Sequence, residues 1–444
     1  MGICILYNQD KTGLEDFFVR LRKRGDPGAN SAETENTVRA ILADVRQRGL
    51  EAVVDYSRRF DAPEFTADQF TVSEDQLEEA SKRVPLADKD CIRRAADNIR
   101  AFHEAQKSSS WFRALPDGSL LGQAVIPMER AGLYVPGGKG GATPLLSSLL
   151  MNAVPAQVAG VGQLAVISPP QADGRVNDHI LAAAHILGIT EVYAAGSAWA
   201  VAALAYGAGP LRPVDVITGP GNIFVATAKR LLIGVVGIDM IAGPSEICIV
   251  ADETANPAWV AADLLGQAEH DALASCVCIA SDQEFAKKCA LELEKQLATL
   301  PRRDIAAASL ASYSAIIVEP KLSAALALVN RIAPEHLELM IADPWAALPA
   351  IRHAGAIFMG SASAEALGDY FAGPNHVLPT MGTARFSSAL SVDNFCKRSS
   401  IIAASPAFAA AHAEDVARLA RLEGLEAHAR SALCREQGAK NSPD

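Results

Sequence analysis

The sequence of 444 residues contains no apolar run long enough to cross a membrane. A membrane-spanning helix needs roughly 18 apolar residues in a row, and Asp239 interrupts the most apolar stretch, LLIGVVGIDMIAG. The start, MGICILYNQD, lacks the cationic and apolar regions of a signal peptide, and Leu6 stands where a myristoylation signal needs Ser or Thr. We therefore expect a cytoplasmic protein with no membrane partner.

Positive charge is also scarce, because 40 Lys and Arg residues stand against 51 Asp and Glu residues, which gives a net charge of -11. Without a basic stripe to attract phosphates, a nucleic-acid partner is not expected. The eight cysteines are scattered, and only Cys276 and Cys278 lie close together, so we predict reduced core thiols rather than disulfides or a cysteine metal site. This composition favours a compact protein that acts on small molecules.

Hydrophobic periodicity predicts a helical region over about the first hundred residues. From Ala131 onward, short β-rich runs alternate with helical ones, and a second such series runs from EICIVAD to GAIFMG. Strands separated by helices of this length indicate parallel sheets with right-handed crossovers. We predict an α/β fold with two doubly wound, Rossmann-like domains and a mostly helical tail beyond about Ser391.

Two constellations of polar residues lie next to apolar segments. Glu335 and His336 stand side by side in RIAPEHLEL, so a carboxylate and an imidazole capable of proton transfer are adjacent. Gln267 and His270 lie three residues apart in a helix that Asn256 is suited to cap, and they share one face. The second pair could chelate one metal ion, or it could be solvated or satisfied in the core.

Further carboxylates and imidazoles lie towards the C-terminus. Asp369 and His376 flank a segment of GDYFAGPNHVLPT that Gly and Pro keep irregular, which suits metal or substrate binding or a turn with an Asp cap. Glu423 and His428 are five residues apart and do not share a helical face. Taken as isolated residues, they read as surface groups.

Two glycine clusters, YVPGGKGGATP and TGPGNIFVATAKR, resemble phosphate-binding turns only weakly. The second follows a strand and places Asn222 near a helix start, but it departs from G-x-G-x-x-G, and no Walker pattern is present. Ser245 follows a Gly-Pro turn but lacks the G-x-S-x-G context of a hydrolase nucleophile. For Ser245 we favour a substrate contact or a cap.

Taken in order, these segments resemble the histidinol dehydrogenase family from about Thr37 to Arg435. The resemblance rests on the motifs GLYVPGG, GPGN, AKRLL, GIDMIAGPSE, QAEHD, APEHLEL, GDYFAGPNHVLPT, ARFSSALSV and EGLEAHA. It implies oxidation of L-histidinol to L-histidine through the aldehyde, the last step of histidine biosynthesis, with two molecules of NAD. It also implies one zinc ion per subunit and a homodimer whose site is shared across the interface.

The resemblance also implies a role for each matching residue. The zinc ligands would be Gln267, His270, Asp369 and His428. The substrate contacts would be Ser245, Gln267, His270, His336, Asp369, His376, Glu423 and His428. The NAD contacts would be Tyr134, Trp199 and Asn222. The expected parts of the chain are an N-terminal extension (1–26), a zinc and catalytic domain (27–131 with 245–390), a second α/β domain contributing to NAD binding (132–244), and a C-terminal segment that crosses to the partner subunit (391–444).

Within this reading His336 is the base that removes the hydroxyl proton, and the adjacent Glu335 activates water for oxidation of the aldehyde hydrate. Zinc would orient the substrate. Neighbours on a strand point to opposite faces, so both residues can serve one cavity only if Glu335 lies in an irregular or helix-start segment.

Two departures from the commoner family pattern concern the cofactor side. Trp199 stands where Gln is common, and the loop 137–147 is about three residues longer. An aromatic ring at 199 could still stack on the nucleotide.

Three other readings compete. A paralogue could oxidise a different alcohol, although all four expected zinc ligands and the Glu335–His336 pair are present. A zinc hydrolase could use Glu335 to activate water, but its H-E-x-x-H signature is absent. A non-catalytic metal-binding or regulatory protein would have little reason to keep an acid and a base side by side.

Overall fold

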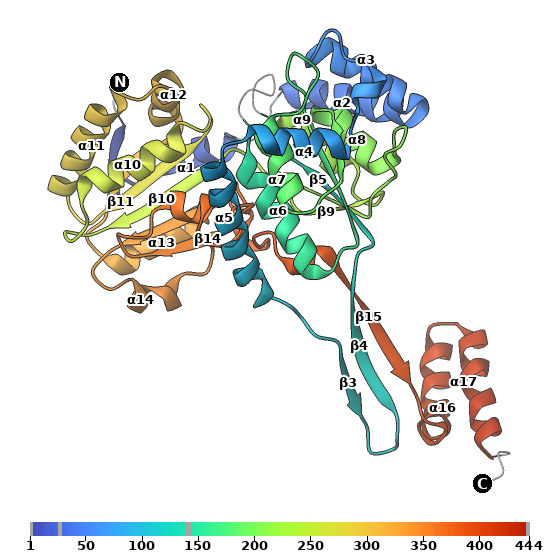
Figure 1. Ribbon diagram of the computed structural model, residues 1–444. Helices are drawn as coiled ribbons and strands as arrows, with labels where there is room; N and C mark the ends of the chain where they lie inside the picture. The colour runs from blue at the N-terminus through green and yellow to red at the C-terminus, as the bar shows by residue number, and fades with distance from the viewer. Residues whose placement is uncertain (1–2, 25–28, 138–143, 441–444) are drawn as a thin grey trace. The chain divides into compact units, whose positions relative to one another are not determined.

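The structure of the protein is a computed structural model that describes residues 3–24, 29–137 and 144–440. It comprises two compact units (Figure 1). The large unit contains Met1–Gln106 and Met128–Phe395, and the small unit contains Lys107–Pro127 and Cys396–Asp444. Most of the glycine-rich loop 137–147, whose length the sequence analysis singled out, lies outside the described residues.

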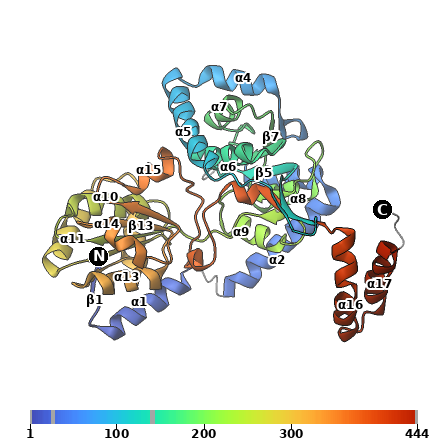
Figure 2. The same cartoon turned by 90° about the horizontal axis from the view of Figure 1, so that it is seen from below.

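Six parallel strands form the first sheet of the large unit, sheet A, in the order β1-β12-β11-β10-β13-β14. They are β1 (Cys4–Tyr7), β10 (Glu246–Ala251), β11 (Ser275–Ala280), β12 (Ala315–Val318), β13 (His336–Met340) and β14 (Ala356–Met359). One face packs against α10 (Pro257–Ala268), α11 (Gln283–Leu297) and α12 (Arg303–Tyr313), and the other against α1 (Lys11–Lys23), α13 (Leu322–Ile332) and α14 (Pro344–Ala347) (Figure 2). Because helices cover both faces, the central strands are apolar on both sides.

Sheet B of the large unit has the order β2-β7-β6-β5-β8-β9. Its strands are β2 (Thr71–Val72), β5 (Arg130–Tyr134), β6 (Gln163–Ser168), β7 (Glu191–Ala194), β8 (Val216–Thr218) and β9 (Gly237–Ile238), and only β2 is antiparallel to its neighbour. The crossover helices are α6 (Leu146–Ala159), α7 (Asp178–Ile186), α8 (Ser197–Tyr206) and α9 (Ile223–Leu231). The strand order reverses at β5, which pairs with both β6 and β8, and such a reversal opens a crevice at the carboxyl ends of the strands. The parallel α/β architecture predicted from the sequence is confirmed.

The structure distributes the N-terminal segments differently from the predicted domain boundaries. Strand β1 pairs with β12, so the described part of residues 1–26 belongs to sheet A and is not an extension. The helices of residues 27–131 contact the helices of sheet B rather than those of the 245–390 region. They are α2 (Ala29–Arg48), α3 (Leu50–Phe60), α4 (Glu74–Arg83) and α5 (Leu86–Glu104). The apolar stripe of a helix shows that one face is buried, but it does not say which sheet buries that face.

The small unit joins two distant stretches of the chain. Strands β3 (Trp111–Ala114), β4 (Leu120–Pro127) and β15 (Cys396–Ala403) form an antiparallel sheet in the order β15-β4-β3. Helices α16 (Pro406–Leu422) and α17 (Glu426–Lys440) lie side by side (Figure 1) around Ala417, Ala420 and Ala429. The predicted helical tail is confirmed, whereas β15 and its pairing with 107–127 were not predicted. That residues 391–444 cross to a partner subunit stays a prediction.

The absences noted in the sequence have counterparts in the structure. Among the helices of residues 3–24, 29–137 and 144–440, none combines the length and apolar character needed to span a membrane. Cys4, Cys91, Cys248, Cys276, Cys278, Cys289 and Cys434 are free thiols. Four of them are buried in sheet A or its helix layer, namely Cys248, Cys276, Cys278 and Cys289. The prediction of core thiols holds for these four, while the others are exposed or half-buried.

Candidate active site

Glu335 and His336 lie at the start of β13. Helix α13 ends at Ile332, Ala333 adopts a left-handed conformation with φ 52°, and Glu335 forms a bend before the strand begins at His336. Both residues are buried, with 6% and 3% of their surface exposed, and His336 Nδ1 lies 3.8 Å from Glu335 Oε2. Because Glu335 precedes the strand, the alternation of side chains does not separate the two groups. As expected for two groups that act together, Glu335 lies in an irregular segment and its carboxylate lies close to the His336 ring.

The main chain of Glu246 holds both members of the Glu335–His336 pair. Its N–H donates to Glu335 Oε2 at 2.8 Å, and its carbonyl oxygen lies 3.0 Å from His336 Nδ1. Since a carbonyl only accepts, this contact places the imidazole proton on Nδ1 and leaves the lone pair on Nε2. Nε2 is buried and has no hydrogen-bond partner among the described residues. In the neutral form of the ring, Nε2 is therefore the nitrogen that can accept a proton.

Burial and neighbouring charge shift the acid–base properties of the pair. Burial raises the pKa of Glu335 to about 8, although the charge of His336 opposes the shift. Burial alone would lower the pKa of His336, but the carboxylates of Glu365 and Glu335 outweigh it and hold that pKa well above its usual value. The positive charge of His336 therefore stabilises ionised Glu335, and ionised Glu335 in turn stabilises the imidazolium of His336.

Two carboxylates approach His336 from α15 (Glu365–Tyr370). Glu365 Oε1 lies 3.5 Å from Nδ1, and Asp369 Oδ1 lies 3.6 Å from Nε2. Residues four apart share a helical face, so both carboxylates point to the same imidazole. Glu365 was not among the residues predicted from the sequence, although its spacing from Asp369 in EALGDY is a signal that could have identified it.

Gln267 joins this group from the last turn of α10. Its side chain is fully buried, and its hydrogen-bond network is satisfied when the amide nitrogen donates to Glu365 Oε1 at 3.0 Å and to the Glu246 carbonyl at 3.2 Å. His270 follows in the turn after α10 and is exposed, and its charge helps to lower the pKa of Asp369. Gln267 therefore lies in the group around His336, with His270 electrostatically coupled to it.

The donor set suits a borderline metal ion such as zinc. One ligand atom from each of His336, Glu365 and Asp369 lies within 4.8 Å of the other two, and imidazole nitrogen and carboxylate oxygen are common zinc ligands. Glu365 Oε2 and His336 Nε2 are buried without partners among the described residues, as expected where a cation would complete the site. Asp369 is common to this cluster and to the predicted zinc set, so the residues present fit a metal ion.

The remaining substrate residues fall into two groups. Ser245 immediately precedes Glu246, and His376 Nδ1 lies 2.9 Å from the main-chain oxygen of Asp369, so both adjoin the site. Glu423 and His428 are exposed residues of the small unit, next to α16 and in α17. Their proposed contribution across a dimer stays a prediction.

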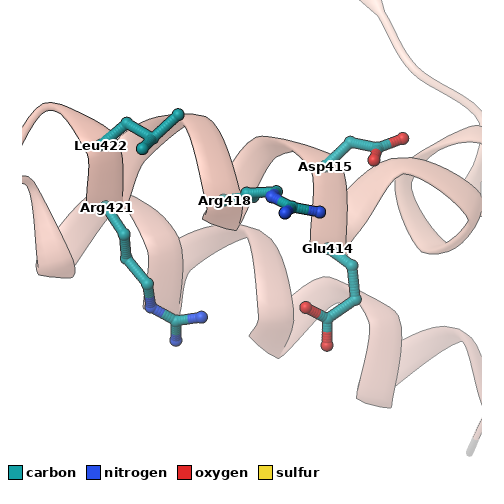
Figure 3. Close-up of a pocket in the computed structure, with 5 residues that line it drawn as sticks. All are labelled: Glu414, Asp415, Arg418, Arg421 and Leu422. Carbon is teal, nitrogen blue, oxygen red and sulfur yellow. The ribbon is translucent and has the colours of Figure 1, made fainter.

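A charged depression on α16 shares no residue with this site. It is lined by Glu414, Asp415, Arg418, Arg421 and Leu422 (Figure 3). Arg421 pairs with Glu426, with Nε 3.1 Å from Oε2. We assign no chemistry to this depression, because it brings together exposed charges of both signs without a buried proton-transfer group.

The expected NAD contacts Tyr134 and Asn222 lie at the carboxyl ends of β5 and β8, where the strand order of sheet B reverses. The Tyr134 hydroxyl accepts a hydrogen bond from the Ser197 main chain at 3.2 Å, and the Asn222 side chain caps α9. A Cβ added to Gly219, whose φ is 118°, would lie 2.1 Å from the Tyr134 carbonyl oxygen. The close approach of the two strand ends therefore requires glycine at this position.

A side chain that stacks on a nucleotide must expose its ring, and the environment of Trp199 does not leave its ring exposed. The residue is buried, its indole nitrogen donates to Ser57 Oγ at 3.2 Å, and its ring stacks against Tyr56 and Phe60. Packing between α8 and α3 therefore accounts for an aromatic residue at position 199. A contact between Trp199 and NAD stays a prediction that this packing does not favour.

Asp61, a half-buried residue whose Oδ2 atom is inaccessible, predicts a pH effect on stability. Burial raises the pKa of Asp61 to about 7, and its Oδ2 has no partner among the described residues. The unfolded chain, with a pKa of about 3.9, loses this proton first, so stability should fall as pH rises from about 4 to about 7. We expect Asp61→Asn to be more stable than the natural protein at pH 8, by up to about 4 kcal/mol, with little difference at pH 4.

Urea unfolding at both pH values measures this difference. Asp97→Asn, which removes the same charge from an exposed position of α5, is the control and should not change the pH profile. Equal losses of stability in the natural protein and Asp61→Asn between pH 4 and pH 8 would show that Asp61 is not the responsible group.

Comparisons with known proteins agree with the family resemblance. Residues 25–436 match the sequence pattern of the family described as histidinol dehydrogenase. The histidinol dehydrogenase of Nitratidesulfovibrio vulgaris is 63% identical over 401 residues, which cover 90% of this chain and 92% of that protein. The histidinol dehydrogenase of Bacillus subtilis is 51% identical over 418 residues, covering 94% and 97%.

The fold is also similar to that of a solved histidinol dehydrogenase structure. The crystal structure of histidinol dehydrogenase from Elizabethkingia anophelis matches with a TM-score of 0.91 at 33% identity, over 99% of each chain. The match covers both sheets and the small unit, so the resemblance inferred from short motifs is confirmed along the chain. The chain belongs to the histidinol dehydrogenase family, the enzymes that oxidise histidinol in histidine biosynthesis.

Proposed function

We propose that the protein catalyses the NAD-dependent and zinc-dependent four-electron oxidation of L-histidinol to L-histidine through L-histidinaldehyde. The observation that carries this proposal is the buried Glu335–His336 pair, held by the main chain of Glu246 beside a metal-type ligand cluster. Two successive oxidations need two proton acceptors, one for the alcohol and one for the water that adds to the aldehyde. Adjacent acid–base groups in one buried site meet that need.

In the first oxidation, His336 Nε2 takes the hydroxyl proton of histidinol as hydride leaves its carbinol carbon for NAD. The Nδ1–H bond to the Glu246 carbonyl keeps the imidazole oriented. The carboxylates of Glu365 and Asp369, 3.5 Å and 3.6 Å from the ring nitrogens, stabilise the imidazolium that forms. The surroundings of His336 therefore favour its protonated product state.

In the second oxidation, Glu335 takes a proton from the water that attacks the aldehyde, and the hydrate then gives its hydride to a second NAD. Burial brings the pKa of Glu335 to about 8, close to neutral pH, where a general base is most effective. The hydrogen bond from the Glu246 N–H holds the carboxylate beside the His336 ring.

The zinc ligands that we propose are Gln267, His270 and Asp369 of one subunit and His428 of its partner. Bound zinc would act as a Lewis acid and a template for the imidazole and amino nitrogens of the substrate. Gln267 and Asp369 both adjoin His336, which supports a template that would lie next to the base. Ser245, His376 and Glu423 would complete substrate binding.

NAD is proposed to bind at the carboxyl edge of sheet B, near Tyr134 and Asn222. The reversal of strand order beside β5 is the feature of doubly wound sheets that accommodates a nucleotide. A homodimer is proposed because Glu423 and His428 lie in a unit separate from the other site residues. Size determination in solution would test that assembly.

The direct test is NADH formation by the zinc-loaded protein with L-histidinol. We expect two NADH per histidinol consumed, loss of activity after chelation of zinc, and its return when zinc is added back. If histidinol is not oxidised while zinc still binds, the substrate assignment is wrong, and a screen of other small alcohols would follow.

A further inference from the structure

We propose that the buried Arg24–Glu246 ion pair is a positioning device for the catalytic residues Glu335 and His336. Arg24 fixes residue 246, and residue 246 fixes both proton acceptors through its main chain. This inference rests on the proposed function, because it assigns a role in the same two oxidations. Arg24 lies one residue before the stretch that matches the family pattern.

Arg24 reaches the site from the end of α1. Its side chain is fully buried, and Nη2 lies 2.5 Å from Glu246 Oε1 and 3.4 Å from the Pro244 carbonyl oxygen. The Nε and Nη1 atoms of Arg24 and the Oε2 atom of Glu246 have no partner among the described residues. One ionic contact therefore balances both buried charges, and removing either residue leaves the other uncompensated.

Residue 246 needs this anchor because it lies where a strand begins. Glu246 pairs with Ser275 of β11, but the pairing of β10 with β13 starts one residue later, at Ile247 and His336. On the β13 side the N–H and C=O of Glu246 therefore meet side chains instead of a strand partner. Strand ends open more readily than strand centres, so a side-chain anchor at this residue limits the movement of both catalytic groups.

Gln267 extends the same arrangement. In the amide orientation that satisfies its surroundings, the Gln267 nitrogen donates to the Glu246 carbonyl at 3.2 Å, the oxygen that also contacts His336 Nδ1. The main-chain groups of residue 246 thus contact the base, the water-activating carboxylate and a proposed zinc ligand. If these main-chain groups move by about 1 Å, the catalytic rate can fall by about 100-fold, because the reacting atoms must be closely aligned.

The test uses Arg24→Met, Glu246→Gln and the double variant, assayed as full-length, zinc-loaded protein with L-histidinol. For each single variant we expect kcat per zinc-loaded site to fall by about 10- to 100-fold, with the KM for NAD changed less than about twofold. The double variant should lose no more than the worse single variant, because it contains no unpaired buried charge. The conservative variant Arg24→Lys should recover part of kcat.

Arg130→Met is the matched control. Arg130 is also buried and paired with a glutamate, Glu191, but it lies at the amino end of β5 in sheet B. We expect this variant to be less stable and to keep its kcat per zinc-loaded site within about twofold.

Three results would overturn the inference. They are an Arg24→Met variant with full kcat, losses in the two single variants that add in the double variant, or an equal loss of kcat in Arg130→Met. If Arg24→Met does not fold, Glu246→Gln decides, because it keeps the main chain and nearly the same side-chain volume. If the natural protein does not oxidise histidinol, the proposed function fails and this inference with it, whereas full kcat in Arg24→Met beside an active natural protein overturns this inference alone.

Discussion

Replacement of His336 by Asn is expected to lower kcat for histidinol oxidation by about 1,000-fold, the usual contribution of a general base. The Asn amide can still donate to the Glu246 carbonyl, which His336 Nδ1 contacts at 3.0 Å, so the local structure should persist. What is lost is Nε2, the buried nitrogen that has no other partner among the described residues. Initial rates of NADH formation with saturating histidinol and NAD measure the effect.

The zinc content of the same variant separates two roles for His336. As a base, His336 can be lost while zinc remains at one ion per subunit. As a ligand of the cluster that it forms with Glu365 and Asp369, its loss should remove the metal. His185→Asn, at an exposed position of α7, serves as the control and should keep kcat within about twofold. A His336→Asn variant that keeps more than a tenth of the natural kcat would exclude the role of base.

Replacement of Glu335 by Gln is expected to separate the two oxidations. Gln keeps an oxygen that can accept the Glu246 N–H bond, observed at 2.8 Å, but it cannot take a proton from water. We expect oxidation of supplied L-histidinaldehyde to fall by about 100- to 1,000-fold, and oxidation of the alcohol to fall by less than about tenfold. The yield should then drop from two NADH per histidinol towards one, with the aldehyde detected as product.

Glu338→Gln is the matched control for this experiment. Glu338 also lies in β13, and burial raises its pKa to about 9, so it is already uncharged at neutral pH and Gln changes little. Its Oε1 accepts the Glu365 N–H at 2.8 Å, a bond that the Gln oxygen can keep. Equal losses in both oxidations for Glu335→Gln would mean that Glu335 acts mainly as the charge partner of His336.

Membership of the family excludes two of the three alternative functions that the sequence left open. A zinc hydrolase and a non-catalytic metal-binding protein were open alternatives on sequence grounds, and membership of an enzyme family with relatives at 63% identity removes both. Oxidation of another alcohol is excluded only by assay. Gln267, Asp369 and Glu335 all lie close to His336, an arrangement compatible with the proposed oxidation of histidinol.

Short-range information in the sequence predicted the helices and strands of both doubly wound regions, and the order of the motifs predicted the family. These features depend on periodicity and on residues close together in the chain, which a sequence displays directly. The pairing of β1 with β12 and the packing of α2 to α5 on sheet B were not predicted. Many helices carry an apolar stripe of the same kind, so the stripe does not identify its partner.

The candidate site was also predicted only in part from the sequence. The adjacency of Glu335 and His336 and the chemical types of Gln267, His270, Asp369 and His376 could be recognised from the sequence. The roles of Glu246 and Arg24 could not, because Glu246 acts through its main chain and Arg24 comes from 222 residues away in the sequence. In addition, Glu246 lies at the amino end of β10 and His336 at the amino end of β13. This edge of the sheet is opposite to the one where doubly wound sheets usually bind ligands.

By itself the sequence determined the family, the kinds of secondary structure and the residues able to transfer protons, because these depend on residue type and local spacing. Only the tertiary structure decided which segments share a sheet, that Glu335 lies in a bend beside His336, and that one buried ion pair lies behind both. Those outcomes depend on contacts between residues far apart in the chain. Such contacts form only where the chain can bury apolar surface and still satisfy its buried charges.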